Sequence, residues 1–352
     1  MHFSIRPGAA PWTLAAAVQY KTGMRLPLSI LDLAPVAAGS SACTALHRCV
    51  DLARLGERLG YVRHWFAEHH SMPSVASAAP EILIAHVAAA TTRIRVGSGG
   101  IMLPNHAPLR IAESFHALAA LHPGRIDLGI GRAPGSDVAA SRALRAAGGD
   151  AIGQQLSELL AFSRNEFPPG HPYRGVHAEP VDAALPPIWL LGSSGASARM
   201  AGQAGMGYSF ASHFSPAPAA PAFAAYRAAF QASADFPQPH AILGMSVVCA
   251  PTTEEAEYHA ATMDLAWLRI RRGEFLPLPS PDEALDYPYS AAEREAIRDY
   301  RALTVVGDPA QVRERIERAA KECGADEVMI VSNLHDPAAR LRSYELVASA
   351  FA

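Results

Sequence analysis

The feature that most constrains the fold is a repeated unit: a short apolar run, a polar or glycine-rich turn, and then an amphipathic helix. The unit recurs from Leu26 to the C-terminus of the 352-residue chain. Continuous apolar strands that alternate with helices are typical of a parallel sheet covered by helices on both faces. The predicted strands are Leu28–Leu33, Tyr61–Phe66, Ile94–Gly99, Arg125–Ile130, Pro187–Leu191, Gly207–Ala211, Ala241–Cys249 and Glu327–Val331.

Eight such units between residues 26 and 352 predict one domain, a closed (β/α)₈ TIM barrel of the α/β class. The alternative is a doubly wound open sheet, in which a G-x-G-x-x-G turn follows the first strand. Here "DLAPVAAGSSACT" stands at that place, without the glycine spacing. Glycines also follow several strands, as expected where many strand ends contribute to one site. We therefore expect the barrel.

Two segments depart from this rhythm. Residues 250–303 contain a predicted helix, Thr253–Arg271, followed by "GEFLPLPSPDEALDYPYS". An excursion of this length is a functional lid or a disordered loop, and its aromatic residues favour a lid that packs on the barrel. Residues 1–25 are predicted to be a disordered leader, or an over-long start ahead of Met24, because their short apolar piece makes a weak secretory signal.

Composition excludes several classes of protein. Lys and Arg number 30 and Asp and Glu 33, so the net charge of −3 argues against a nucleic-acid binder. No uncharged, proline-free apolar run of 18 residues is present, which argues against a membrane span. The cysteines, at positions 43, 49, 249 and 323, form no CxxC pair. We expect reduced thiols and a cytoplasmic protein.

The first candidate for chemistry is "WFAEHH", where the second predicted strand runs into its loop. In a barrel this end of a strand faces the active site. Glu68, His69 and His70 lie there together, and histidine is the side chain that titrates near neutral pH. A structural role is the alternative, since the chain has 15 histidines.

The second candidate is "IRVGSGGIMLPNHAPLRIAE". Gly97, Gly99 and Gly100 stand in a predicted strand, where each glycine costs roughly 0.5–1 kcal/mol. Either the strand bulges there, or a flat ligand touches the backbone where a side chain would intervene. Asn105 and His106 follow and are expected at the mouth of the barrel.

Two further segments suggest an anion site. Arg132 ends a buried strand in "RIDLGIGRAPG", where its charge is costly unless it meets an anion such as phosphate. In "PIWLLGSSGASARMAGQ" a strand leads through Ser193 and Ser194 into a helix, whose first N–H groups, with Ser197, bind anions. Ordinary serine capping of the helix is the alternative. Arg132 and this turn must converge for one phosphate to be bound.

In their order and spacing these four segments resemble the bacterial luciferase-like flavin-dependent monooxygenases, and more closely the single-chain oxidoreductases of that group. The resemblance covers nearly everything from Leu26 to the C-terminus. It implies a (β/α)₈ barrel that binds FMN, with the phosphate at the strand ends and the ring across the barrel mouth. It also implies a homodimer, which we expect to form through the early helices and the alanine- and serine-rich segment Pro73–Thr92.

The resemblance assigns roles to individual residues. His69 matches the catalytic base, and Gly99–Gly100 matches a non-prolyl cis peptide beneath the flavin ring. Luciferase has a histidine immediately before the proline that matches Pro108, whereas this chain has Ala107, so it departs from luciferase at the mouth. The residues that match the family's phosphate site are Arg132 with Ala133, and the turn Ser193, Ser194, Gly195 and Ser197.

The function that this resemblance implies is a two-component monooxygenase. A separate NAD(P)H:flavin reductase would deliver reduced FMN, which with O₂ oxidises a small organic substrate held near Glu68, His70, Asn105 and His106. One alternative is hydride transfer by a deazaflavin coenzyme on the same fold, and another is flavin binding without turnover. A metal-dependent hydrolase built on His69, His70 and His106 is disfavoured, because the first strand reads "SILDL" and lacks the H-x-H of barrel hydrolases.

Overall fold

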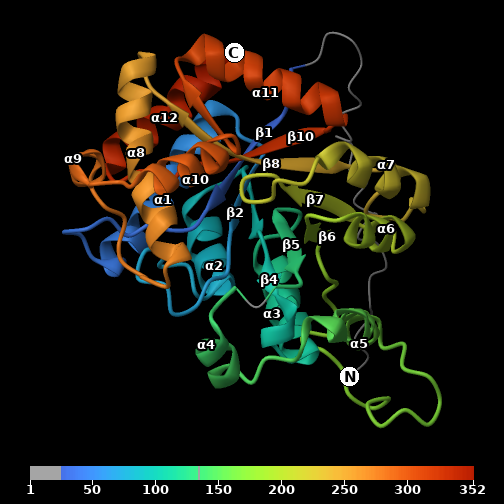
Figure 1. Cartoon of the computed structure of the whole chain (residues 1–352). Coiled ribbons are helices and arrows are strands. Elements are labelled where there is room, and N and C mark those ends of the chain that lie inside the picture. Colours follow the sequence, from blue (N-terminus) through green and yellow to red (C-terminus); the bar gives the residue numbers. More distant parts are fainter. Residues whose placement is uncertain (1–24, 134) are drawn as a thin grey trace.

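The computed structural model describes residues 25–133 and 135–352 (Figure 1). The predicted leader, apart from Arg25, lies outside the described residues. Within them, no helix combines the length and the hydropathy that crossing a membrane requires.

Eight parallel strands close into a barrel, as the sequence predicted. Each strand pairs with the next in the order β1, β2, β3, β5, β6, β7, β8, β10, and β10 pairs in turn with β1. Figure 1 shows the strands at the centre, with helices around them. The barrel strands are β1 (Leu28–Asp32), β2 (Arg63–Phe66), β3 (Arg95–Ser98), β5 (Ile126–Gly131), β6 (Ile188–Gly192), β7 (Gly207–Ala211), β8 (Ala241–Cys249) and β10 (Glu327–Val331).

Two short strands extend the barrel and were not predicted. β3 ends at Ser98, one residue before the end of the predicted strand Ile94–Gly99, and β4 (Ile101–Met102) pairs with β5 just beyond it. β9 (Thr304–Gly307) pairs with the second half of β8, while the first half of β8 pairs with β10. The nine residues of β8 therefore belong partly to the barrel and partly to this extension.

Helix boundaries follow from local capping. The Oγ of Ser41 accepts a hydrogen bond from the N–H of Thr44 at the start of α1, and Gly60 ends that helix in the left-handed region. Proline stands in the first turn of α2, α3, α11 and α12, where its missing N–H costs nothing. The helices are α1 (Ala42–Leu59), α2 (Pro80–Ala90), α3 (Pro108–Leu121), α4 (Val138–Ala143), α5 (Ile152–Arg164), α6 (Gly195–Gln203), α7 (Ala219–Ala229), α8 (Thr253–Arg271), α9 (Pro281–Asp286), α10 (Ala291–Arg301), α11 (Pro309–Cys323) and α12 (Pro337–Ala350).

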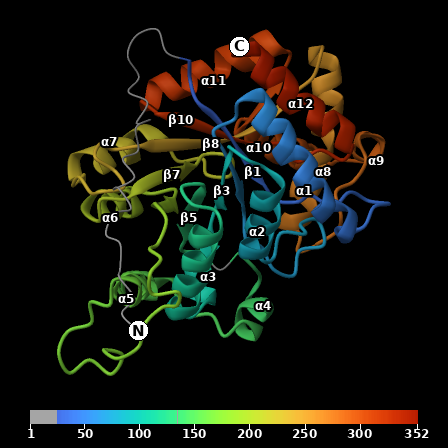
Figure 2. The ribbon, with the colours of Figure 1, turned by 180° about the vertical axis from the view of Figure 1, so that it is seen from behind.

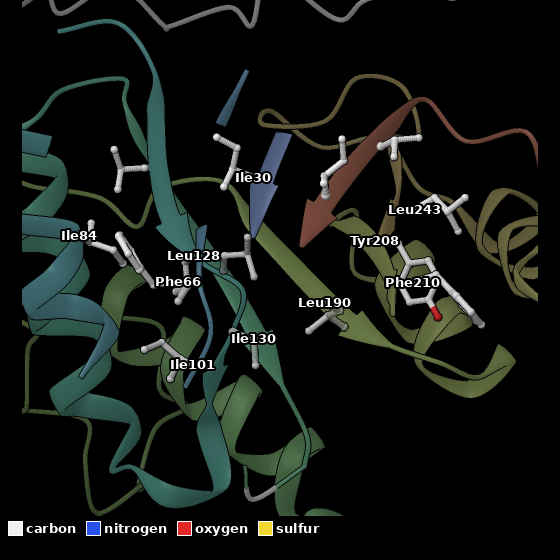
Figure 3. Close-up of a cluster of buried hydrophobic side chains, with 14 of the residues drawn as sticks. Ile30, Phe66, Ile84, Ile101, Leu128, Ile130, Leu190, Tyr208, Phe210 and Leu243 are labelled. Atoms are coloured by element: carbon white, nitrogen blue, oxygen red, sulfur yellow. The ribbon is translucent and has the colours of Figure 1, made fainter. Parts of the chain in front are cut away.

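The main core lies between the strands and the surrounding helices. Figure 3 shows Phe66 beside Ile84 of α2, and Tyr208 and Phe210 of β7 together at the right of the view, in the same cluster. From behind, α1 and α12 lie next to each other over β1, so the first and last helices cover the closure of the barrel (Figure 2). A second apolar cluster that includes Trp65 and Trp189 packs separately from this core.

Residues 250–303 form α8, α9 and α10 with their connections. Backbone hydrogen bonds attach this insertion to the loop after β1: Leu278 N–H donates to the Val36 carbonyl, and Ala38 N–H donates to the Leu278 carbonyl, both at 2.8 Å. Tyr287 and Tyr289 pack on the α8–α9 cluster, so the aromatic residues of the insertion have apolar partners. The lid role stays a prediction.

A buried cluster of charges connects the strands near their amino ends. The Arg63 guanidinium lies 2.8 Å from carboxylate oxygens of both Asp127 and Glu327, and 4.6 Å from the Trp189 ring centroid. Asp127 also accepts hydrogen bonds from Trp65 and from Arg95. Because each buried carboxylate has cationic partners, the cluster holds charge in the interior without an unpaired ion.

This cluster predicts acid sensitivity. Burial raises the pKa of Glu327, but Arg63 and His240 outweigh burial and lower it from the ordinary 4.5 to about 2. The ionised carboxylate therefore stabilises the fold above pH 4.5, and this stabilisation is lost as the pH falls towards 2. We expect the free energy of unfolding, measured in urea, to fall by on the order of 3 kcal/mol over this range. The variant Glu327→Gln should have a lower free energy of unfolding at neutral pH, and this free energy should fall less steeply as the pH is lowered. The control Glu274→Gln, at an exposed position, should behave like the wild-type protein in both respects.

Candidate active site

The carboxyl ends of the barrel strands carry the residues that the sequence singled out. Glu68, His69 and His70 follow β2, Arg132 follows β5, and the serine turn follows β6. In a parallel barrel these ends share one face. The structure thus places the candidates on the face where barrel enzymes hold their active sites.

Glu68 is the centre of a hydrogen-bonded cluster. Its side chain is fully buried and accepts hydrogen bonds from the Met102 N–H at 2.8 Å and from Asn105 Nδ2 at 3.0 Å. The Nε2 atoms of His70 and His106 lie 2.8 and 2.9 Å from Glu68 Oε1. Burial raises the pKa of Glu68, but the hydrogen bonds and the charge of His106 outweigh it, so the pKa lies below the ordinary value. The carboxylate is ionised and fully used in holding the loop after β4.

The pKa of His106 is shifted upward, opposite to the shift of Glu68. Burial lowers its pKa, yet the hydrogen bond and the negative charge of Glu68 raise it above the ordinary value. The sequence placed Asn105 and His106 at the mouth. Both side chains hydrogen-bond to Glu68, which was expected at the mouth with them, so their contact with a substrate stays a prediction. The histidines that the hydrolase alternative needs as ligands, His70 and His106, are likewise hydrogen-bonded to Glu68. No group of three or more His, Cys, Asp or Glu in the described ranges could hold a metal ion.

His69 has no such partner. Its backbone N–H donates to the Ser77 carbonyl at 3.0 Å, but its side-chain Nδ1 is buried and has no hydrogen bond within the described residues. Burial lowers the pKa of His69, with the charge of Glu68 acting against this and that of His70 with it. The imidazole is therefore neutral near pH 7, which is the state that a general base requires.

The Gly99–Gly100 peptide bond is cis, as the resemblance implied. The glycines themselves have a simpler explanation than a flat ligand. A Cβ on Gly99 would lie 2.7 Å from the Leu31 side chain, and one on Gly100 would lie 2.8 Å from the Gly129 carbonyl oxygen. Gly97 is equally crowded by the next strand. Close packing of the neighbouring strand β5 thus accounts for Gly97 and Gly100 without a ligand, whereas a Cβ on Gly99 would meet only the side chains of Leu31 and Trp65.

The residues of the candidate anion site lie at the ends of two neighbouring strands, β5 and β6. Ile130 of β5 pairs with Leu190 of β6, so the same register places Arg132 level with Gly192. The Arg132 side chain is exposed, as is Ala133, and no described residue forms an ion pair with it. The phosphate-site residues carried over from the two segments therefore lie at adjacent strand ends.

The N-terminus of α6, which follows β6 beside the Arg132 strand end, has no side-chain cap. Ser194 is the N-cap residue of α6, but its side chain makes no capping hydrogen bond, so the alternative of ordinary serine capping is wrong for Ser194. Ser193 and Gly195, on either side, are half-buried. The Ser197 hydroxyl donates to the Ser194 carbonyl at 2.9 Å, which occupies its proton but leaves its oxygen able to accept. The free N–H groups of the first turn fit an anion.

The chain is similar to known proteins over most of its length. The sequence pattern of the family described as luciferase-like monooxygenase matches residues 26–327. The chain belongs to the luciferase-like monooxygenase family. A luciferase-like monooxygenase of Escherichia coli (strain K12) is 42% identical over 328 residues, which are 92% of this chain and 97% of the relative.

Solved structures agree with this assignment. The structure of apo-MsnO8 superposes with a TM-score of 0.84 at 40% identity and covers 93% of this chain and 98% of its own. More distant neighbours share the fold alone. One is the oxygenating constituent of a Pseudomonas putida 3,6-diketocamphane monooxygenase in complex with FMN (TM-score 0.70, 20% identity, 93% and 98% covered). Another is an F420-dependent secondary alcohol dehydrogenase (TM-score 0.65, 13% identity, 94% and 100% covered). The expectation of an enzyme of this family is confirmed.

Sequence reasoning missed one residue of this face. His213 stands two residues beyond the end of β7, and its Nδ1 is buried without a hydrogen bond. Its position just after a predicted strand was the available signal, the same signal that singled out His69.

Glu68→Gln tests the cluster. Replacing the carboxylate removes the negative charge that raises the pKa of His106, so this pKa, followed by NMR of the imidazole signals, should fall. One acceptor oxygen also becomes a donor facing donors, which should cost about 1–3 kcal/mol of stability. Glu81→Gln is the control: Glu81 acts on His106 by charge alone, so its effect should be smaller. Equal changes in the pKa of His106 for the two substitutions would contradict the assignment of Glu68 as its hydrogen-bonded partner.

Proposed function

We propose that the protein is a two-component, FMN-dependent monooxygenase, which receives reduced FMN from a separate NAD(P)H:flavin reductase and uses O₂ to oxidise a small organic substrate. One observation carries the cofactor assignment: Arg132, without an ion-pair partner in the described chain, lies level with the open N-terminus of α6. Reduced FMN, when bound, supplies the electrons that activate O₂. Family membership supports the monooxygenase reaction, and the FMN complex of a fold neighbour supports the cofactor.

In this proposal each group of residues has a separate role. Arg132 and the first N–H groups of α6, with Ser193, bind the phosphate. His69 accepts or donates a proton at a ring nitrogen that no described side chain occupies. Glu68 fixes the loop that carries Asn105 and His106. The insertion of residues 250–303 covers the site and excludes water.

A deazaflavin-dependent hydride transfer is the second candidate, because an F420-dependent enzyme shares the fold. The two reactions differ in their need for oxygen. O₂ consumption that depends on reduced FMN supports the monooxygenase. Anaerobic reduction of F420 with no effect of FMN would replace it with the alternative.

The phosphate assignment predicts that FMN binds much more tightly than riboflavin, which lacks the phosphate. Arg132→Ala should weaken FMN binding about 10- to 150-fold, the equivalent of roughly 1.5–3 kcal/mol for a hydrogen bond to a charged group. Riboflavin binding should be unchanged by this substitution. Calorimetric titration of both flavins with both proteins measures this, and equal affinities for FMN and riboflavin would rule out the phosphate site.

The role of His69 is tested by His69→Ala. If His69 moves a proton during the reaction, the variant should keep its FMN affinity but lose about 10²–10⁴-fold in turnover. Reduced FMN and O₂ should then yield H₂O₂ in place of oxidised product, which a peroxidase-coupled assay counts per reduced FMN consumed. A structural His69 would instead give a lower melting temperature with unchanged H₂O₂ release. A metal ligand at this position would make activity sensitive to chelators.

We also propose a homodimer formed through the early helices. Ile82 on α2 and Leu121 at the end of α3 are 66% and 70% exposed, so apolar surface is available there. Sedimentation at micromolar concentration should show a dimer of the 37.3 kDa chain. Ile82→Asp should shift it toward monomer, whereas Leu285→Asp, at a similarly exposed position on α9, should not. A monomeric wild-type protein would contradict the proposal.

A further inference from the structure

A buried tyrosine reaches the start of α6, where the phosphate site is proposed. Tyr208 lies on β7, the strand next to β6, and its side chain is fully buried among the apolar residues of the core (Figure 3). Its hydroxyl group lies 3.2 Å from the Ser194 carbonyl oxygen and 3.3 Å from the Ser197 hydroxyl. Burial raises the pKa of Tyr208, and the hydrogen bonds with Ser197 and Ser194 offset this only in part. The phenol therefore keeps its proton near neutral pH and can donate it.

The Ser194 carbonyl has more hydrogen-bond donors around it than it can accept. A carbonyl oxygen has two lone pairs. The N–H of Ala198, which makes the first hydrogen bond of α6, lies 3.2 Å from this oxygen. The hydroxyl groups of Ser197 and Tyr208 lie 2.9 and 3.2 Å from it. The two hydroxyl groups thus compete for the one remaining lone pair, and either of them can satisfy it.

Ser197 is the hydroxyl group that can leave this carbonyl for a ligand. The residue is half-buried, whereas Tyr208 is enclosed by the core. The Ser197 Oγ lies against Gly192, where an added Cβ would overlap it, and Gly192 is level with Arg132 in the strand register. The oxygens of a phosphate group are strong hydrogen-bond acceptors. Ser197 therefore contributes to a phosphate site only if its proton turns from the Ser194 carbonyl toward the ligand.

We propose that Tyr208 is a positioning residue of the phosphate site: its hydroxyl donates to the Ser194 carbonyl in place of Ser197, so that Ser197 can donate its proton to the bound phosphate. The family resemblance assigns Ser197 to the phosphate site, and the contacts of Tyr208 explain how its proton becomes available. Without the Tyr208 hydroxyl, the carbonyl would lose a hydrogen bond whenever Ser197 turned to the ligand. The identity of the ligand as FMN rests on the proposed function, whereas the exchange of the two hydroxyl groups requires only a phosphate group.

A double-mutant cycle on FMN binding tests this exchange. Tyr208→Phe should weaken FMN binding about 2- to 12-fold, as expected for the loss of one neutral hydrogen bond. Ser197→Ala should weaken it about 10- to 150-fold, as expected for a hydrogen bond to a charged group. Because Tyr208 acts through Ser197, adding Tyr208→Phe to Ser197→Ala should change the affinity no further. Calorimetric titration of the four proteins measures this cycle, and riboflavin, which lacks the phosphate, should bind all four equally.

Tyr226→Phe is the matched control. Tyr226 is also fully buried, its ring centroid lies 5.6 Å from that of Tyr208, and its hydroxyl donates to the Met206 carbonyl, which precedes β7. Removing this hydroxyl should lower the melting temperature without changing the affinity for FMN. An unchanged FMN affinity in Tyr208→Phe, or independent effects of Tyr208→Phe and Ser197→Ala in the double variant, would overturn the proposal.

Inorganic phosphate separates this proposal from the proposed function. In the flavin-free protein, the binding of millimolar phosphate, followed by phosphorus NMR, should weaken in Tyr208→Phe by the same factor as the binding of FMN. It should be unchanged in Tyr226→Phe. Phosphate binding that depends on Tyr208, without any binding of FMN, would count against the proposed function alone. Phosphate and FMN affinities that are both independent of Tyr208 would overturn its positioning role.

Discussion

Pairing between β1 and β10 joins strands from opposite ends of the chain, and the rest of the structure depends on it. Leu28 pairs with Val328 and Ile30 with Ile330, about 300 residues apart in sequence. This pairing closes the ring, which removes the exposed sheet edges and fixes the register of every other strand. Only in a closed ring do the carboxyl ends of β2, β5 and β6, which precede the candidate site residues, meet at one mouth.

Buried polar groups are hydrogen-bonded to different extents at the two ends of the barrel. Near the amino ends, Arg63, Asp127 and Glu327 satisfy one another, and the result is a rigid interior. At the carboxyl ends, His69 and His213 keep unpaired ring nitrogens. Unpaired buried atoms are not confined to that end, because Trp189 Nε1, beside Arg63, also lacks a hydrogen bond in the described chain. At the carboxyl ends Glu68 is fully hydrogen-bonded, so that end also contains a completed polar cluster.

Much of this followed from the sequence, and the failures have a common cause. All eight barrel strands were predicted to within a few residues, because buried parallel strands are continuous apolar runs. The cis peptide and the position of His69 came from short contiguous motifs. The Arg63 cluster and the hydrogen bond between His106 and Glu68 were missed. Each depends on partners distant in sequence: Arg63 reaches Glu327 across 264 residues, and His106 reaches Glu68 across 38. No local pattern encodes such distances.

The double pairing of β8 has a consequence for how this enzyme can vary. Cys249, at the end of β8, pairs with Gly307 of β9, so the chain leaves and re-enters the barrel at adjacent points. The two ends of the insertion between them therefore lie side by side, so its length and sequence can change without altering the register of the barrel strands. Exchanging residues 250–303 between relatives would thus replace the segment that is hydrogen-bonded to the loop after β1 while keeping the strands of the barrel.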